Sequence, residues 1–119
     1  MTKTETISVA DIIGGDLCIS SEDGQKVFDK IVPILQTGKH VVISFEQISM
    51  LISLFLNAAI GQLYGKFTED QIRSKLEVTG LAGDDMEILR RVVENAKRYY
   101  ANRTEYDKAW LATEGDYEE

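Results

Sequence analysis

Cysteine, histidine and proline are almost missing from this chain of 119 residues, which holds one of each. The single cysteine, Cys18, cannot form an internal disulfide, and with His40 as the only histidine no cluster has metal-ligand spacing. His40 lies at the start of a predicted strand, so the serines lack an obvious base and a Ser-His-Asp system is not predicted. We therefore expect no cofactor, no enzymatic activity and a reduced, cytoplasmic setting.

Positive charge is also scarce, since 13 Lys and Arg residues face 20 Asp and Glu residues and the net charge is −7. Nucleic acids and anionic membrane surfaces bind clustered Lys and Arg, so neither is predicted as a partner. A long apolar run is missing as well. Residues 50–60 are too few to span a membrane and are interrupted by Ser53 and Asn57, whereas a spanning helix needs about 20 apolar residues.

What remains predicts one α/β domain over residues 1–102, in the order ββαβα(α)βα. The expected elements are a hairpin-like pair at 5–13 and 17–19, a helix over 20–38 with a kink or early break at Pro33, a strand at 40–45 covered on both faces, a helix from about Ser53 to Tyr64, a short helix capped by Thr68, a strand at 78–81 and a helix capped by Asp84. Together they predict a small mixed four-stranded sheet packed with about four helices.

The last part of the chain is polar on its outer side and acidic at its end. Glu87 and Arg91 have the i, i+4 spacing of a solvated helix face. Residues 103–119 carry two basic and six acidic residues, so we interpret them as an acidic tail of charge −4, with a short helix around Trp110.

Ser53 carries the main open question. It follows the connection that leaves a predicted strand and precedes an apolar helix, so its hydroxyl is placed to cap that helix. Functional crevices form at the carboxyl ends of strands in open α/β sheets, so a phosphorylated hydroxyl at a helix start is the alternative interpretation. Asn57, on the same helix, is interpreted either as a partnered polar group beside the core or as a ligand-binding residue.

Residues 41–45, the loop to Ser53 and residues 55–65 together resemble the STAS-like domain of unknown function found in bacterial proteins. Gly14-Gly15, Glu22-Asp23-Gly24 and the segment 94–97 also resemble that family, so the resemblance spans about residues 5 to 102. It implies a fold similar to the STAS domains of anti-sigma-factor antagonists.

In those antagonists a serine at a helix start is phosphorylated by a partner kinase of the histidine-kinase-like ATPase class, which switches binding off. On this chain Phe45 matches the strand phenylalanine of that motif and Ser53 the phosphoacceptor serine, while Leu56 and Gly61 match its later positions. The residues around the serine differ: Ile52, Leu54 and Phe55 stand where the motif has aspartate, serine and glycine.

The resemblance therefore implies a signalling module that binds a partner protein, such as a histidine-kinase-like ATPase or an anti-sigma-type regulator, through the loop 46–53 and the start of the following helix. The candidate phosphoacceptor or partner-binding residues are Ser53, Ser49, Gln47 and Asn57. Two alternatives stay open. One is a small-molecule domain that binds a nucleotide or another anion in the same crevice, and the other is a homo-oligomer built by the apolar helix with Tyr99, Tyr100 and Trp110.

Overall fold

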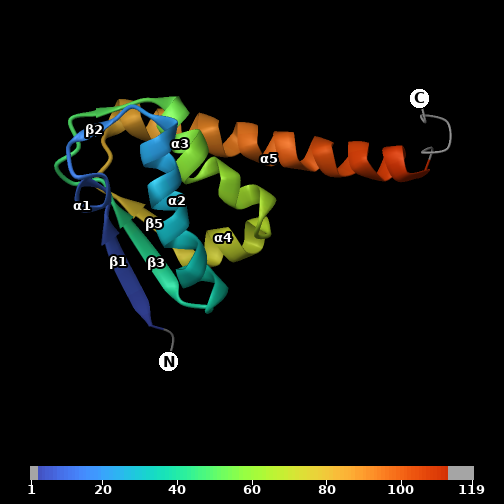
Figure 1. The fold of residues 1–119 in the computed structure, drawn as a ribbon, viewed down its shortest axis with the longest axis horizontal. Helices are drawn as coiled ribbons and strands as arrows, with labels where there is room; N and C mark the ends of the chain where they lie inside the picture. The colour runs from blue at the N-terminus through green and yellow to red at the C-terminus, as the bar shows by residue number, and fades with distance from the viewer. Residues whose placement is uncertain (1–2, 113–119) are drawn as a thin grey trace.

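A computed structural model describes residues 3–112, with side chains described to residue 101. Within that range it has five α-helices, one 3-10 helix and five short strands (Figure 1). In chain order the elements are β1 (Thr4–Ser8), α1 (Val9–Ile13), β2 (Leu17–Cys18), α2 (Ser21–Gln36), β3 (His40–Ser44), β4 (Met50–Leu51), α3 (Ser53–Ala59), η1 (Gly61–Gly65), α4 (Glu69–Lys75), β5 (Leu76–Thr79) and α5 (Gly83–Ala112).

The strands lie in two separate parallel sheets. The larger has the order β1-β3-β5, in which Ile43 pairs with Ile7 on one side and Val78 on the other. The smaller joins β2 to β4 and pairs Leu17 with Met50. The α/β class is thus confirmed, whereas a single mixed four-stranded sheet is not confirmed, because the described strands divide into two sheets with parallel pairing.

The expected hairpin at residues 5–19 is wrong, because a short helix follows β1. Ser8 caps this helix, α1, by accepting a hydrogen bond from the backbone N–H of Asp11 at 3.2 Å. Gly14 ends it in the left-handed conformation, with φ of 72° and its N–H bonded to the carbonyl of Ala10. Local capping therefore overrides the β-branched pattern, and β2 leaves toward β4 instead of returning along β1.

Helix α2 forms where its cap and apolar spacing predict it. Ser20 accepts a hydrogen bond from the N–H of Asp23 at 3.1 Å, and Val27, Ile31 and Leu35 are buried. The expected break at Pro33 does not occur, since the helix continues to Gln36.

Strand β3 is buried fully on one face only. Val41 and Ile43 are buried, while Val42 and Ser44 between them are half-buried, so the expected cover on both faces is not found. The core consists of one cluster, whose largest fully buried members are Phe45, Phe55, Ile31, Ile43, Leu56, Ile60 and Leu63.

Three helical segments and η1 pack in succession beside the sheet. Helix α2 contacts β3 and α3, and α5 lies along α3 and η1. A Cβ atom at Gly24 of α2 would lie 2.5 Å from the backbone oxygen of Phe55, so the two helices meet backbone to backbone. This close approach fixes the position of α3, and α3 in turn is one wall of the groove described below.

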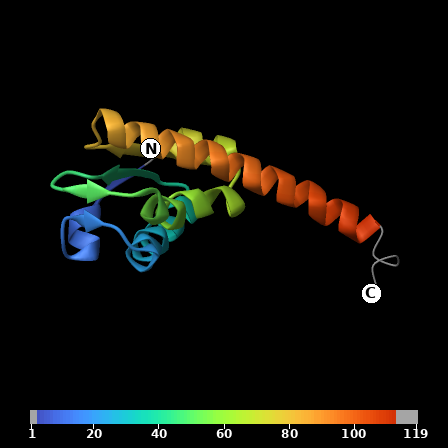
Figure 2. The same ribbon diagram turned by 90° about the horizontal axis from the view of Figure 1, so that it is seen from above.

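Helix α5 runs along the body and then projects beyond it in both views (Figures 1 and 2). It begins at Gly83, so Asp84 lies in its first turn instead of preceding the helix as a cap. It continues to Ala112 without interruption, so Trp110 lies on this helix and not on a separate short one. The domain boundary at residue 102 stays a prediction, and residues 113–119 of the expected tail lie outside the described residues.

Candidate functional site

Ser53 is the first residue of α3, and the expected cap is wrong. Ile52 occupies the cap position in an extended conformation and no side chain caps the helix. The reason is the β2–β4 ladder, because the N–H of Ile52 donates to the carbonyl of Cys18 at 3.1 Å and so carries extended backbone up to the helix. The Ser53 side chain is exposed and has no hydrogen bond to another described residue.

Ser53 and Asn57 line a groove between α3 and α5, which we call the α3–α5 groove. It consists of two adjoining hollows of about 420 and 250 Å³, both lined by Asn57 and Asn95. The larger one is lined by Leu51, Ile52, Ser53, Asn57, Ile88, Arg91, Val92 and Asn95. The smaller one adds Gly61, Gln62, Ala96, Tyr99 and Tyr100. The structure thus brings two of the four candidate residues together.

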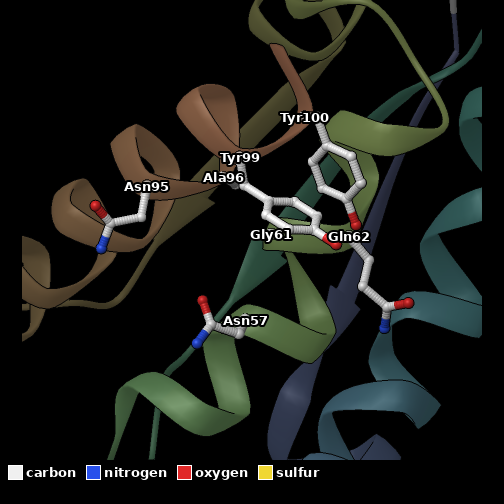
Figure 3. Close-up of a pocket in the computed structure, with 7 residues that line it drawn as sticks. All are labelled: Asn57, Gly61, Gln62, Asn95, Ala96, Tyr99 and Tyr100. Atoms are coloured by element: carbon white, nitrogen blue, oxygen red, sulfur yellow. The ribbon is translucent and has the colours of Figure 1, made fainter. Parts of the chain in front are cut away.

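Two tyrosines form the aromatic end of the α3–α5 groove. Figure 3 shows Asn57 on the α3 side and Asn95 on the α5 side, with both tyrosine rings extending from α5 toward η1. The Tyr99 and Tyr100 rings meet edge to face, with centroids 4.8 Å apart at 82°. The Tyr100 ring also lies so close to the backbone of Gly65 that a Cβ atom there would clash with it. This packing holds the aromatic end in place.

Gln62, close to Asn57 in the chain, is a partnered polar group. Its Nε2 donates to the Gln25 side-chain oxygen at 2.8 Å and to the carbonyl of Ala58 at 2.9 Å. Asn57 differs, since it is exposed on the groove and has no hydrogen bond among the described residues. The structure thus shows Asn57 as an exposed residue of the groove, and its interpretation as a ligand-binding residue stays a prediction.

Gln47 and Ser49 lie apart from this groove. The Ser49 hydroxyl donates to the Asp16 carboxylate at 2.5 Å, and the Ser49 N–H donates to the Asp16 carbonyl at 2.8 Å. Gln47 has a positive φ of 70° and lines a separate hollow beside Gly14, Gly15 and Asp16. The candidate residues of the loop 46–53 therefore line two separate hollows, and the four candidate residues do not form one site.

An exposed apolar surface follows from the pairing of β2 with β4. Alternate residues of a strand face opposite sides, so Cys18 and Leu51 point into the core while their neighbours point outward. We call these outward residues and the adjoining one on α3 the apolar strip, and their exposed fractions are Leu17 45%, Ile19 42%, Met50 54%, Ile52 36% and Leu54 51%. These five large apolar side chains are exposed on β2, on β4 and on the segments that directly follow these strands.

Cys18 is shielded beneath the apolar strip. Burial raises the pKa of its thiol to about 12, and the nearby carboxylates of Asp23 and Asp85 add to the shift. An activated thiol needs a lowered pKa and solvent access, so Cys18 has the features of a structural residue.

The described part of the chain holds no group of three or more His, Cys, Asp or Glu side chains that could bind a metal ion. None of the helices described has the length and the apolar content that a membrane crossing requires.

The helix opposite Ser53 supplies the residues that sequence reasoning missed. Arg91, Asn95 and Tyr99 lie at i, i+4 and i+8 on α5, next to the buried Val92 and Ala96. The predicted pair of Glu87 and Arg91 is found at 3.8 Å, but Arg91 also lines the α3–α5 groove. A polar row at helical spacing beside a buried row was the available signal. The sequence interpretation took Glu87 with Arg91 as a solvated face and named Tyr99 only in the homo-oligomer alternative.

The α3–α5 groove does not lie at the strand ends, where the separate hollow lined by Gln47, α1 residues and Gly14 to Asp16 is found. None of the residues that line the α3–α5 groove belongs to β1, β3 or β5, because β4 and its extension through Ile52 separate the start of α3 from the larger sheet. The groove is a helix–helix feature, and α5 makes up half of it.

Comparison with known proteins gives one result. A family model described as a STAS-like domain of unknown function matches residues 23–86, more than half of the chain. The matched range includes Ser53 and Asn57 and ends before Arg91 and Asn95. No curated protein and no solved structure matches.

Proposed function

Because this chain belongs to the family of STAS-like domains of unknown function, we propose that it is a non-catalytic signalling module that binds a partner protein through the loop 46–53 and the first turn of α3. The observation that carries the proposal is the apolar strip, which occupies the end of that loop and the adjoining strand β2. A partner that covered the strip would remove several large apolar side chains from water together.

The strip is large enough to anchor a partner. Burying one Leu, Ile or Met side chain completely stabilises by about 1.5–3 kcal/mol. The protein leaves 36–54% of the surface of each strip residue exposed to water. A partner that covered the strip could therefore bury roughly half of the surface of each of these residues. The resulting gain of several kcal/mol is the scale at which a few central anchors decide a protein interface.

Charge around the strip favours a partner with a basic rim. Asp16 directly precedes Leu17, and Asp85 lies close enough to Cys18 to affect its titration. Among the described residues neither carboxylate has an ion pair, and the whole chain carries a net charge of −7. Complementary Lys and Arg on the partner would speed association and fix its orientation.

Its position and exposure support Ser53 as the switch of this interaction. It lies between Ile52 and Leu54, two members of the apolar strip, and its hydroxyl is exposed. A phosphate there would add a charge of about −1.5 to −2 within an apolar interface, which weakens binding through desolvation. The family resemblance makes a histidine-kinase-like ATPase the first candidate for both partner and kinase.

Affinity capture from the native host tests the proposal. We expect the wild-type chain to recover a partner that the double variant Leu17→Ser/Met50→Ser loses and that the control Lys30→Ser, on the exposed side of α2, retains. Ser53→Asp should weaken capture of the same partner and Ser53→Ala should not. Equal recovery by the double variant would exclude the strip as the docking surface, and equal recovery by both Ser53 variants would exclude the switch.

A further inference from the structure

We propose that the α3–α5 groove is a separate binding site for a small planar anion of the size of a nucleoside monophosphate. This site lies beside the apolar strip and shares only Ile52 with it. The inference therefore does not depend on partner binding, and the two can fail independently.

The groove offers hydrogen-bond donors that the protein does not use itself. Ser53 and Asn57 have no hydrogen bond to other described residues. The Asn95 side-chain oxygen accepts from Arg98 at 3.2 Å, which leaves its amino group for a ligand. The guanidinium of Arg91 is 3.8 Å from the Glu87 carboxylate, longer than a hydrogen bond, and its side chain is 73% exposed.

The α3–α5 groove also lacks the negative charge that is common elsewhere in this chain. No Asp or Glu lines either hollow, although the chain has 20 acidic residues, and Arg91 is the one cation among the described lining residues. The Glu87 carboxylate near Arg91 is the closest opposing charge that the structure places there. An arginine fork beside a hydroxyl and two amides favours a phosphate or carboxylate ligand.

The aromatic end selects a planar group. Tyr99 is 58% exposed, and its edge-to-face contact with Tyr100 leaves the ring at the groove while restricting its motion (Figure 3). The small residues Gly61 and Ala96 line the same hollow, and a Cβ atom at Gly61 would lie 3.7 Å from the Ala96 Cβ. Stacking of a base on an exposed aromatic ring stabilises binding by about 1–3 kcal/mol in proteins that bind single-stranded nucleic acids.

The order of groups along the groove matches such a ligand. Arg91 and Ser53 lie in the larger hollow, Tyr99 lies in the smaller one, and Asn57 and Asn95 line both. The anionic group would contact Arg91, the ring would stack on Tyr99, and the amides would bind the polar edge between them. Volumes of about 420 and 250 Å³ together lie within the range of small-ligand pockets.

Titration of the 119-residue chain with AMP and CMP, followed by NMR of backbone amides, tests this site. We expect shifts confined to residues 53–62 and 88–100, and a dissociation constant at least about tenfold lower than for adenosine or inorganic phosphate alone. Arg91→Gln should weaken AMP about tenfold and leave adenosine unchanged, while Tyr99→Leu should weaken both. The control Arg90→Gln, one position along the same helix, should bind AMP as the wild type does.

Three outcomes would overturn the inference. The first is the absence of shifts with millimolar nucleotide, and the second is shifts that map away from the groove. The third is equal binding of inorganic phosphate and AMP, which would indicate a simple anion contact without a role for Tyr99. A variant that fails to fold is recognised by its amide spectrum, and Asn57→Ala, at an exposed position, then replaces it with the same expected tenfold loss.

Discussion

At the scale of single residues, Cys18 differs from its two neighbours on either side in its exposure to solvent. Cys18 sits on β2 between two exposed residues of the apolar strip, yet it is fully buried and points into the core. Its neighbours are available to a partner, whereas its thiol is available only after the chain opens. The chemistry of the strip is therefore hydrophobic contact and not covalent reaction.

Cys18 should react very slowly with thiol reagents in the folded protein. Only the thiolate attacks, and burial together with Asp23 and Asp85 raises the thiol pKa to about 12. At pH 8 we expect labelling by a disulfide reagent to be limited by unfolding and to become fast in denaturant. Rapid labelling of the native chain at the unfolded rate would contradict the buried position.

The raised pKa of the Cys18 thiol also predicts how the free energy of unfolding changes at high pH. The unfolded thiol titrates near its ordinary pKa while the folded thiol stays neutral, so the unfolded state loses its proton first. As the pH rises above that ordinary value, the free energy of unfolding should fall.

At the scale of elements, the contact between α2 and α3 positions the start of α3. Gly24 is buried in this contact, and an added Cβ would lie 2.5 Å from the Phe55 backbone oxygen and 2.8 Å from the Ala58 Cβ. Backbone atoms cannot move aside as a flexible side chain can. The spacing of the two helices, and with it the place of Ser53, therefore depends on glycine at this position.

Gly24→Ala should destabilise the protein even though alanine favours helix more than glycine by about 0.5–1 kcal/mol. Overpacking at the α2–α3 contact costs about 1–3 kcal/mol, so the net change is a loss of up to about 2.5 kcal/mol in the free energy of unfolding. Urea denaturation measures this change. Lys30→Ala on the exposed side of α2 is the control and should change stability by less than about 0.5 kcal/mol. A more stable Gly24→Ala variant would show that the helices can separate.

Elements with strong local signals were predictable from the sequence. The cap at Ser20 and the capping box of Thr68 with Gln71 place the starts of α2 and α4 as expected. Strand β4 was missed because its two residues, Met50 and Leu51, lie inside an apolar run without any boundary signal. The separation of β2 from the main sheet was missed for a related reason, since the pairing partner of a two-residue strand is decided by tertiary contacts.

The sequence predicted the α3 side of the α3–α5 groove but not its α5 side. Ser53 and Asn57 were found because both interrupt an apolar helix, which is visible in one segment of the chain. Arg91 and Asn95, which line the same groove, lie more than 30 residues away on α5, and no local pattern indicates that α5 packs along α3. The apolar strip was missed because exposure of Leu17 and Met50 depends on a sheet that the sequence did not reveal.

At the scale of the whole molecule, the apolar strip and the α3–α5 groove lie side by side at the start of α3. Ile52 belongs to both, and Ser53 lines the groove while lying between Ile52 and Leu54 of the strip. A ligand in the groove or a phosphate on Ser53 would therefore act at the border of the partner surface. Oligomeric state and cellular location stay predictions from the sequence.

Site-specific photocrosslinking tests the central claim, that the apolar strip is the partner surface, most directly. A photoreactive amino acid in place of Met50, the most exposed strip residue, is irradiated in the native host, with the same residue in place of Lys30 as control. The account predicts a defined heavier adduct from position 50, containing one partner protein, and none from position 30. No adduct from position 50, or the same adduct from both positions, would contradict it.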